Sequence, residues 1–181
     1  MPAQAGSNHR GDTEAREWKI VKPDGSLIRN EIKYGMKTDQ VTEDLKRIFS
    51  QEIIKVTVKS NKRATVSVNP HSITDIAGYL YSTLGLRFII ASALHTKKGF
   101  EILYHFSMDL SGLVLNIHVI LDHDNPQIES LSNMFNASNW IEREMHELFG
   151  INFLNHPNQE KLISDGNWAE GIYPYRKDFG K

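Results

Sequence analysis

The sequence predicts an α+β fold with an antiparallel or mixed sheet, helices on one side of it, and an extended C-terminal tail. Helical and strand-like segments occur in separate runs, and three successive strand-like runs between residues 87 and 121 indicate a meander. The pattern changes at residue 150, where an amphipathic helix gives way to about thirty residues without periodicity. We expect a disordered leader over 1–16, one α+β domain over 17–150 and an extended tail over 151–181.

Composition narrows the classes of function. A length of 181 residues fits one domain. The balance of 21 basic and 22 acidic residues lacks the positive footprint of a nucleic-acid binder. The absence of cysteine excludes disulfides, thiol nucleophiles and cysteine-ligated iron–sulfur clusters within this chain. No window approaches the roughly 18 apolar residues that a membrane span needs. A cysteine-ligated redox centre that serves this protein therefore lies in a partner.

The first half of the chain alternates helix and hairpin signals. A Pro-Asp-Gly turn after Trp18 separates two short runs that are typical of a hairpin. An apolar stripe at helical spacing predicts a helix from about residue 41 to 49, with Thr38 or Asp39 as its N-cap. Alternation over 53–58 and 64–68 predicts a second hairpin. Ser72, with Asp75 three residues later, resembles a capping box that starts a second helix.

The second half contains the meander and the last helices. Strands are expected over 87–96, 100–110 and 113–122, and alternation in the third strand predicts one covered and one partly polar face. A short helix is expected over 128–135. The next helix, over 139–149, has Ser138 or Asn139 as its N-cap, an apolar stripe that includes Trp140, and Gly150 as a left-handed terminator.

Few residues point to chemistry within the chain. The sequence contains no glycine-rich nucleotide-binding motif and no nucleophile elbow. Glu142 and Glu144 are two apart on a helix and point in different directions, whereas Arg143 and Glu147 are four apart and can pair. One alternative is a small metal-dependent enzyme. Its oxygen- and nitrogen-rich site at the sheet edge would use His118, Asp122, His123 and Asp124. A polar strand end explains the same residues more simply.

The C-terminal third has a specific resemblance. Its pattern is Glu-Arg-Glu followed by an acid, two apolar residues and Gly, then His-Pro, then Arg-Lys-Asp-aromatic. It resembles the thirty-kilodalton subunit of respiratory complex I (NADH:quinone oxidoreductase) and its relatives in membrane-bound nickel–iron hydrogenases and sulfane-sulfur reductases. The residues that match are Glu142, Arg143, Glu144, Glu147, Leu148, Phe149, Gly150, Ile151, Phe153, His156, Pro157, Trp168, Arg176, Lys177, Asp178 and Phe179.

The resemblance implies a cofactor-free subunit of a membrane-bound complex. Such a subunit packs against the large catalytic subunit of the peripheral arm, and its tail wraps that partner at the cytoplasmic face of the membrane. A neighbouring small subunit holds an iron–sulfur cluster, and the nickel–iron centre or quinone site belongs to the large subunit. Partner binding is then expected from the matching residues between Glu142 and Phe179, except Leu148 and Ile151, and from two tail aromatics, Tyr173 and Tyr175.

Two departures from the family pattern bear on which branch of the family the chain resembles. Glu160 stands where a basic residue is usual, and Tyr173-Pro174-Tyr175 replaces the usual Gly-x-Pro-Leu before Arg-Lys-Asp. The short end after Phe179 resembles the hydrogenase or sulfane-reductase branch. The alternative is the thirty-kilodalton subunit of an NADH- or other donor:quinone oxidoreductase.

Overall fold

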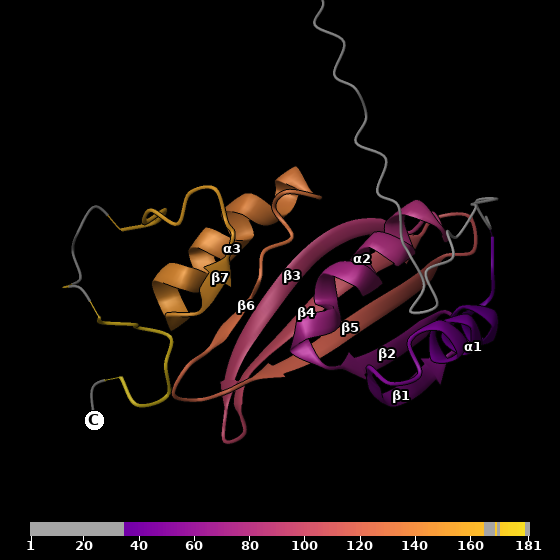
Figure 1. Ribbon diagram of the computed structural model, residues 1–181, viewed down its shortest axis with the longest axis horizontal. Coiled ribbons are helices and arrows are strands. Elements are labelled where there is room, and N and C mark those ends of the chain that lie inside the picture. The colour runs from indigo at the N-terminus through magenta and orange to yellow at the C-terminus, as the bar shows by residue number, and fades with distance from the viewer. Residues whose placement is uncertain (1–34, 165–168, 170, 180–181) are drawn as a thin grey trace, which may run out of the picture.

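The computed structural model describes residues 35–164, 169 and 171–179 (Figure 1). The leader expected over 1–16 and the hairpin expected around the Pro-Asp-Gly turn lie outside these residues. The described chain forms a five-stranded mixed sheet in the order β1-β2-β5-β4-β3 and a separate two-stranded sheet, β6-β7. This confirms the predicted α+β class. No helix in the described part of the chain is long and apolar enough to cross a membrane.

The helices and strands follow one another along the chain with short connections. They are α1 (Thr38–Ile48), β1 (Ile53–Ser60), β2 (Arg63–Val68), a 3-10 turn (Pro70–Ser72), α2 (Ile73–Ser82), β3 (Arg87–Thr96), β4 (Gly99–Met108), β5 (Leu113–Leu121), β6 (Gln127–Glu129), α3 (Asn136–Phe149) and β7 (Asn152–Leu154). The hairpin predicted over 53–68 is present as β1 and β2, and the predicted meander is present as β3, β4 and β5.

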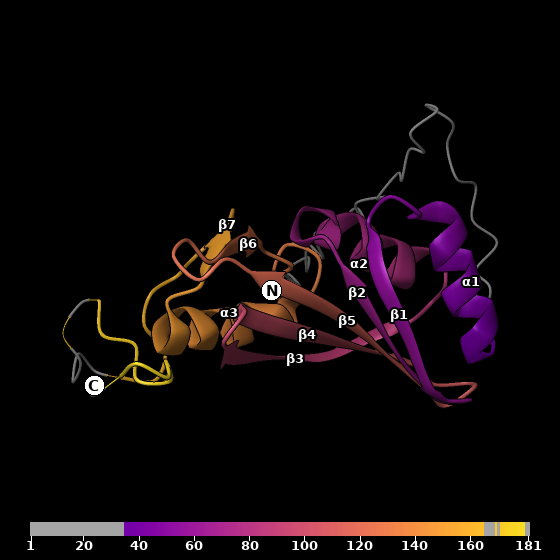
Figure 2. The ribbon, with the colours of Figure 1, turned by 90° about the horizontal axis from the view of Figure 1, so that it is seen from below.

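The five-stranded sheet has one covered face and one open face. Strands β3, β4 and β5 pair antiparallel, and β2 pairs parallel to β5, which makes the sheet mixed. Alternate residues of β5, from Leu113 to Leu121, are buried, whereas Asn116 and His118 lie on the open face. The three helices contribute to the same buried core as the covered face, which agrees with helices on one side (Figures 1 and 2).

Three local expectations differ from the structure. Residues 127–129 form strand β6 where a helix was expected over 128–135, because Ile128 pairs with Phe153 of β7. Ser72 starts α2 without a capping box, since its hydroxyl donates to the Asn69 carbonyl. Helix α3 begins at Asn136, three residues earlier than expected, and Trp140 lies outside its buried stripe, with 67% of its surface exposed.

Strand β7 belongs to the folded domain. It pairs parallel to β6, and Ile151 and Phe153 are completely buried in the core. The tail was expected to begin at residue 151. The last described strand therefore ends at Leu154, and the described residues after it form no helix or strand.

We predict that Phe153→Ala lowers the free energy of unfolding by about 3–5 kcal/mol, because it leaves a cavity in a packed core. Ile163→Ala, at a tail residue that is 58% exposed, serves as the control. It should change the free energy of unfolding by less than about 0.5 kcal/mol. Urea unfolding measures both. Equal losses, or no loss for Phe153→Ala, would show that β7 is not part of the cooperative unit.

Candidate functional site

Helix α3 is the platform for the candidate site. Its C-terminal end is set by Gly150, which adopts a left-handed conformation with φ of 71°. After β7 the chain returns and runs along α3, beside which the tail is drawn in yellow in Figure 1. Because residues 155–164, 169 and 171–179 form no helix or strand, their backbone polar groups need partners from elsewhere.

Glu147 of α3 supplies an acceptor for three consecutive tail amides. Its carboxylate accepts from the amides of Leu162 at 2.7 Å, Ile163 at 2.8 Å and Ser164 at 2.8 Å, and also from the Ser164 hydroxyl. Burial by itself raises the pKa of Glu147, but these hydrogen bonds favour the ionised form more strongly and lower the pKa to about 2. Glu147 is therefore a fixed anion around which the tail turns.

Arg143, one turn earlier on α3, holds the preceding stretch. Its guanidinium donates to the carbonyls of Glu160 at 2.9 Å and Lys161 at 3.0 Å. The side chains of Arg143 and Glu147 were expected to be able to pair with each other, and both instead bind tail backbone. Donor and acceptor groups on one helix face thus fasten residues 160–164.

The last residues of the tail bind the end of α3. The amide of Tyr175 donates to the Leu148 carbonyl at 3.1 Å, and Nε of Arg176 donates to the Phe149 carbonyl at 2.6 Å. The carbonyls of the last helical residues accept no hydrogen bond from within the helix. A Cβ on Gly150 would lie 2.6 Å from the Arg176 guanidinium, so glycine allows the close passage of the tail.

Arg176 also contacts two aromatic rings. Its guanidinium carbon lies 5.0 Å from the centre of the Phe100 ring and 4.4 Å from the centre of the Tyr173 ring. Cation–π contacts of this kind stabilise an arginine that lies between aromatic faces. Arg176 therefore joins the tail to strand β4 as well as to α3.

Glu142 lies inside the protein and organises the turn before α3. It is completely buried and accepts from the hydroxyls of Ser130 and Ser138 and from the Leu131 amide. Burial raises its pKa, although these hydrogen bonds favour ionisation. Partner binding was expected from Glu142. With no exposed surface, its side chain instead holds the segment between β6 and α3.

The sequence-predicted residues fall into three classes of exposure. Buried are Glu142, Glu147, Phe149 and Phe153. Half-buried are Arg143, Gly150, Tyr173 and Arg176. His156 is half-buried as a whole residue, but its side chain is completely buried beside Glu142 and belongs with the first class. Exposed are Glu144, Pro157, Tyr175, Lys177, Asp178 and Phe179. Trp168 lies outside the described residues. Contact with a partner in this conformation is therefore open to the second and third classes, whereas the buried residues support them from beneath.

Several large apolar side chains of the tail face outward. We call this set the tail strip, and its exposed fractions are 58% for Ile163, 40% for Ile172, 61% for Tyr175 and 45% for Phe179. Tail backbone groups and the Arg176 side chain bind the domain, whereas the side chains of the tail strip keep 40% to 61% of their surface exposed. Grouped exposed apolar residues are typical of protein interaction sites.

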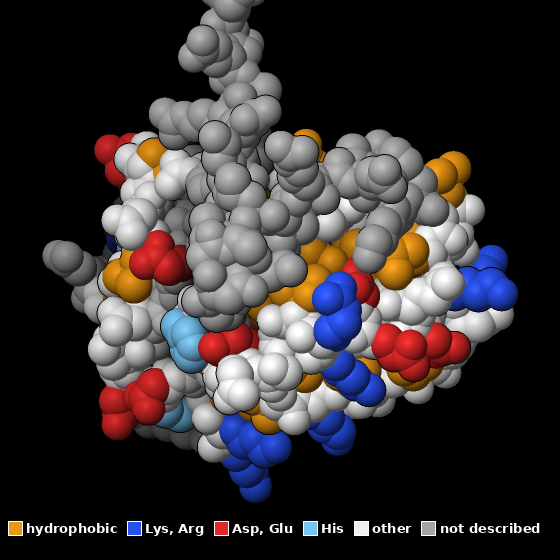
Figure 3. Space-filling model, turned by 45° about the vertical axis from the view of Figure 1, so that its right-hand side comes forward, with side chains coloured by type: hydrophobic (Ala, Val, Ile, Leu, Met, Phe, Trp, Pro, Cys, Tyr) orange, Lys and Arg blue, Asp and Glu red, His pale blue; other side chains and the backbone are white. Residues whose placement is uncertain are grey.

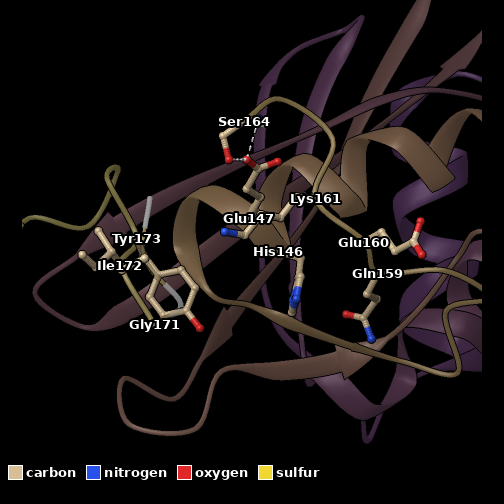
Figure 4. Close-up of a pocket in the computed structure, with 10 residues that line it drawn as sticks. His146, Glu147, Gln159, Glu160, Lys161, Ser164, Gly171, Ile172 and Tyr173 are labelled. Carbon is tan, nitrogen blue, oxygen red and sulfur yellow. Dashed lines mark hydrogen bonds between the residues drawn. The ribbon is translucent and has the colours of Figure 1, made fainter. Parts of the chain in front are cut away.

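A hollow of about 390 Å³ opens between the C-terminal half of α3 and the tail (Figure 4). His146, Glu147, Gln159, Lys161, Ile172 and Tyr173 contribute to its lining. Glu147 is already occupied by tail amides, and the ring N–H of His146 donates from Nδ1 to the Ile151 carbonyl at 2.9 Å. In the lining, no nucleophilic side chain lies beside a base that is free to accept its proton. The hollow therefore does not have the arrangement of a hydrolytic site.

The residues of the alternative metal site point to different places. His118 is bound to Ser67 and Glu101 on the open face of the sheet. Asp122 accepts the amides of two residues that follow it, and His123 faces another histidine. Within the described ranges, no three His, Cys, Asp or Glu side chains are grouped so that they could hold a metal ion.

Surface charge on the face shown in Figure 3 is mixed. Acidic and basic side chains are interspersed over it. A nucleic-acid surface favours a continuous basic patch. This face does not have that character.

Three groups of residues in the site were not foreseen. Ser130 and Ser138 bind Glu142, and only the four-residue spacing of Ser138 and Glu142 on α3 gave a signal for this contact. Ser164, which binds Glu147, has no distinguishing sequence context. His95 binds the end of the tail and lies buried in β3, and no sequence motif marked it.

We predict that Glu147→Gln loosens residues 160–164 without unfolding the domain. The neutral side chain weakens hydrogen bonds to a charged acceptor that are worth about 1.5–3 kcal/mol. Hydrogen exchange at the amides of residues 162–164 should therefore accelerate by one to two orders of magnitude, which corresponds to roughly this free energy. Glu144→Gln, on the exposed face of α3, is the matched control and should have no effect. Equal exchange in both variants would contradict the role of Glu147.

The contribution of Glu147 to holding the tail decreases as the pH falls. The pKa of Glu147 is lowered from 4.5 to about 2, so its contribution is complete above pH 4.5 and is lost as the pH falls toward 2. Protection of the amides at 162–164 should decrease over this range in the wild type. The Glu147→Gln variant should lack that change.

The chain is similar in sequence to subunits of respiratory dehydrogenases. It is 31% identical over 121 residues to the C subunit of NADH-quinone oxidoreductase from Chelativorans sp., covering 64% of this chain and 59% of that one. It is 28% identical over 147 residues to the C subunit of F(420)H(2) dehydrogenase from Methanosarcina mazei, covering 80% and 92%. The chain therefore spans about three fifths of the bacterial relative and nearly all of the archaeal one.

Two solved structures have a similar fold. A chain of the archaeal membrane-bound sulfane sulfur reductase matches with a TM-score of 0.69 and 19% identity, over 78% of this chain and 84% of that one. The trypsin-resistant fragment of Nqo5 matches with a TM-score of 0.57 and 16% identity, over 66% and 97%. At these identities the likeness concerns the fold.

The family model of the respiratory-chain NADH dehydrogenase 30 kDa subunit matches residues 66–181, which is more than half of the chain. The match begins within β2 and includes the meander, α3 and the tail. It confirms the resemblance seen in the sequence: the chain belongs to the family of the respiratory-chain NADH dehydrogenase 30 kDa subunit.

Proposed function

We propose that the chain is a non-catalytic peripheral-arm subunit of a membrane-bound complex I-type electron-transfer complex. Its partners are the large catalytic subunit and a small iron–sulfur subunit, and it reaches the cytoplasmic face of the membrane only through the complex. Iron–sulfur clusters, and a quinone site or a nickel–iron centre, belong to the partners. Family membership and the absence of cysteine from the chain support this assignment.

The tail strip is the surface proposed to contact the large subunit. The observation that carries this proposal is the division of the tail into two sides. Its backbone is fixed to α3 by Glu147, Arg143 and the carbonyls at the helix end, whereas the side chains of the tail strip keep 40% to 61% of their surface exposed. A fixed backbone reduces the entropy lost when these side chains bind a partner.

Exposed aromatic residues of the strip are the proposed anchors. Tyr175 and Phe179 lie at its C-terminal end, beside the charged side chains of Lys177 and Asp178, which are also exposed. Aromatic side chains surrounded by polar ones are the usual centre and rim of a protein interface. Glu144 and Trp140 of α3 are exposed as well and extend the proposed surface onto the helix.

For the branch, the sequence relatives favour a donor:quinone type of complex. The similar proteins are named as the C subunits of NADH-quinone oxidoreductase and of F(420)H(2) dehydrogenase. The hydrogenase or sulfane-reductase branch is the second candidate, and the shared fold of the sulfane sulfur reductase chain supports it. Mass spectrometry of the native complex, which identifies the co-purifying subunits, separates the two.

We predict that Tyr175→Ala and Phe179→Ala together weaken binding to the large subunit at least about tenfold, because each removes an exposed aromatic anchor. The measurement is the Kd for the purified large subunit of the same complex. Leu110→Ala, at a residue 76% exposed in the β4–β5 turn, is the control and should leave the Kd unchanged. If the double variant binds as tightly as the wild type, the tail strip is not the interface.

A further inference from the structure

The end of the tail is held by a histidine of the main sheet. The amide of Lys177 donates to Nδ1 of His95 at 2.9 Å, although the two residues are 82 apart in the sequence. His95 lies near the end of β3 and is 7% exposed. Its ring stacks on Phe100 with 4.4 Å between the ring centroids. This contact fixes the segment that carries Tyr175 and Phe179 of the tail strip.

The other nitrogen of His95 faces a second histidine. Nε2 of His95 lies 2.9 Å from Nε2 of His123, which follows β5. A neutral imidazole has one N–H group. Because Nδ1 of His95 accepts from Lys177, the proton of His95 lies on Nε2 and is donated to Nε2 of His123. His123 then carries its own proton on Nδ1. A metal ion at Nε2 of His95 would need the lone pair that this proton occupies.

We propose that His95 and His123 form a pH-sensitive latch that holds residues 175–178 in position for the partner. The latch is closed while the His95 imidazole is neutral, and a proton on its Nδ1 opens it. The regulatory role rests on the function proposed above for the tail strip, whereas the latch itself is a property of the isolated chain.

Neither histidine can take up a proton without losing a hydrogen bond. A proton on Nδ1 of His95 would bring two N–H groups together, one from the ring and one from the Lys177 amide. A proton on Nε2 of His123 would meet the N–H of His95. In both cases a donor–acceptor contact becomes a donor–donor contact, which costs the bond and leaves a buried donor unsatisfied.

Most of the groups around His95 lower its pKa. Burial lowers its pKa first, followed by His123 beyond β5 and by Arg176 and Lys177 of the tail, whereas Asp178 of the tail raises it. Phe100 of β4 brings no charge. Because the pKa lies below the ordinary 6.5, the latch is at full strength above pH 6.5 and weakens as the pH falls toward the lowered value.

The consequence is that acid weakens partner binding through the loss of preorganisation. A closed latch presents Tyr175 and Phe179 in one position, and an open latch adds the cost of ordering the tail during binding. By linkage, a bound partner also holds the pair in its neutral state. The interface is therefore expected to form best at neutral and alkaline pH.

Hydrogen exchange of the full chain without partner, corrected for the intrinsic pH dependence of exchange, tests the latch. From about pH 8 to about pH 5, the protection of the amides at 175–178 should fall below pH 6.5, by at most about tenfold per pH unit for one proton. His95→Gln offers a carbonyl oxygen that does not titrate, so its protection should not vary with pH. His123→Ala removes a group that lowers the pKa of His95, so the difference from the ordinary 6.5 becomes smaller and the total decrease in protection should be smaller than in the wild type. His71→Gln, at an exposed histidine, is the matched control and should behave as the wild type.

The proposal is overturned if wild-type protection at 175–178 is constant over this range, or if His95→Gln keeps the wild-type pH dependence. Unchanged protection of the β4 amides shows that each variant is folded. His123→Ala tests the same pair at a residue on the surface. Binding of the chain to the large subunit is measured in a separate experiment, at about pH 8 and about pH 5.5. A latch that opens while capture stays the same would contradict the coupling to the tail strip and leave the latch intact.

Discussion

The carboxylate of Glu147 is the interaction on which the described tail depends. Residues 160–164 form no helix or strand, and three of their consecutive amides bind this one anion. The neighbouring carbonyls bind Arg143, and the carbonyls at the end of α3 accept from the last residues of the tail. Helix α3 therefore satisfies the tail backbone in the way that a neighbouring strand satisfies a strand. The charged residues of the helix were expected to face a partner, and three of them, Glu142, Arg143 and Glu147, instead bind groups of the chain itself.

This arrangement explains how a segment without its own core can still present a defined surface. The polar backbone faces inward and binds α3 and His95, so the apolar side chains that remain face outward. Gly150 permits the close crossing, because any side chain there would displace Arg176 and Tyr173. The chain supplies a support for the tail, and the partner proposed for it supplies the cover for the tail strip.

Regular periodicity made most of the fold predictable. The alternation in β5, the apolar stripes of α1 and α2, and the glycine that ends α3 all gave correct elements. Strand β6 could not be recognised, because a three-residue strand has no measurable period and Ile128 depends on Phe153, far along the chain. The burial of Glu142 was also hidden, since a carboxylate on a helix normally lies in solvent and only the fold supplies its serine donors. The family pattern marked this residue as important without indicating its environment.

The most direct test of the proposed division of the tail is hydrogen exchange of the chain with and without its large subunit. If the tail strip is the interface, binding slows exchange in residues 171–179 and at Ile163, whereas the open face of the main sheet, around Asn116 and His118, exchanges as in the free chain. Protection that appears on the open face of the sheet while the tail is unchanged would contradict the account and would place the partner on the opposite side of the molecule.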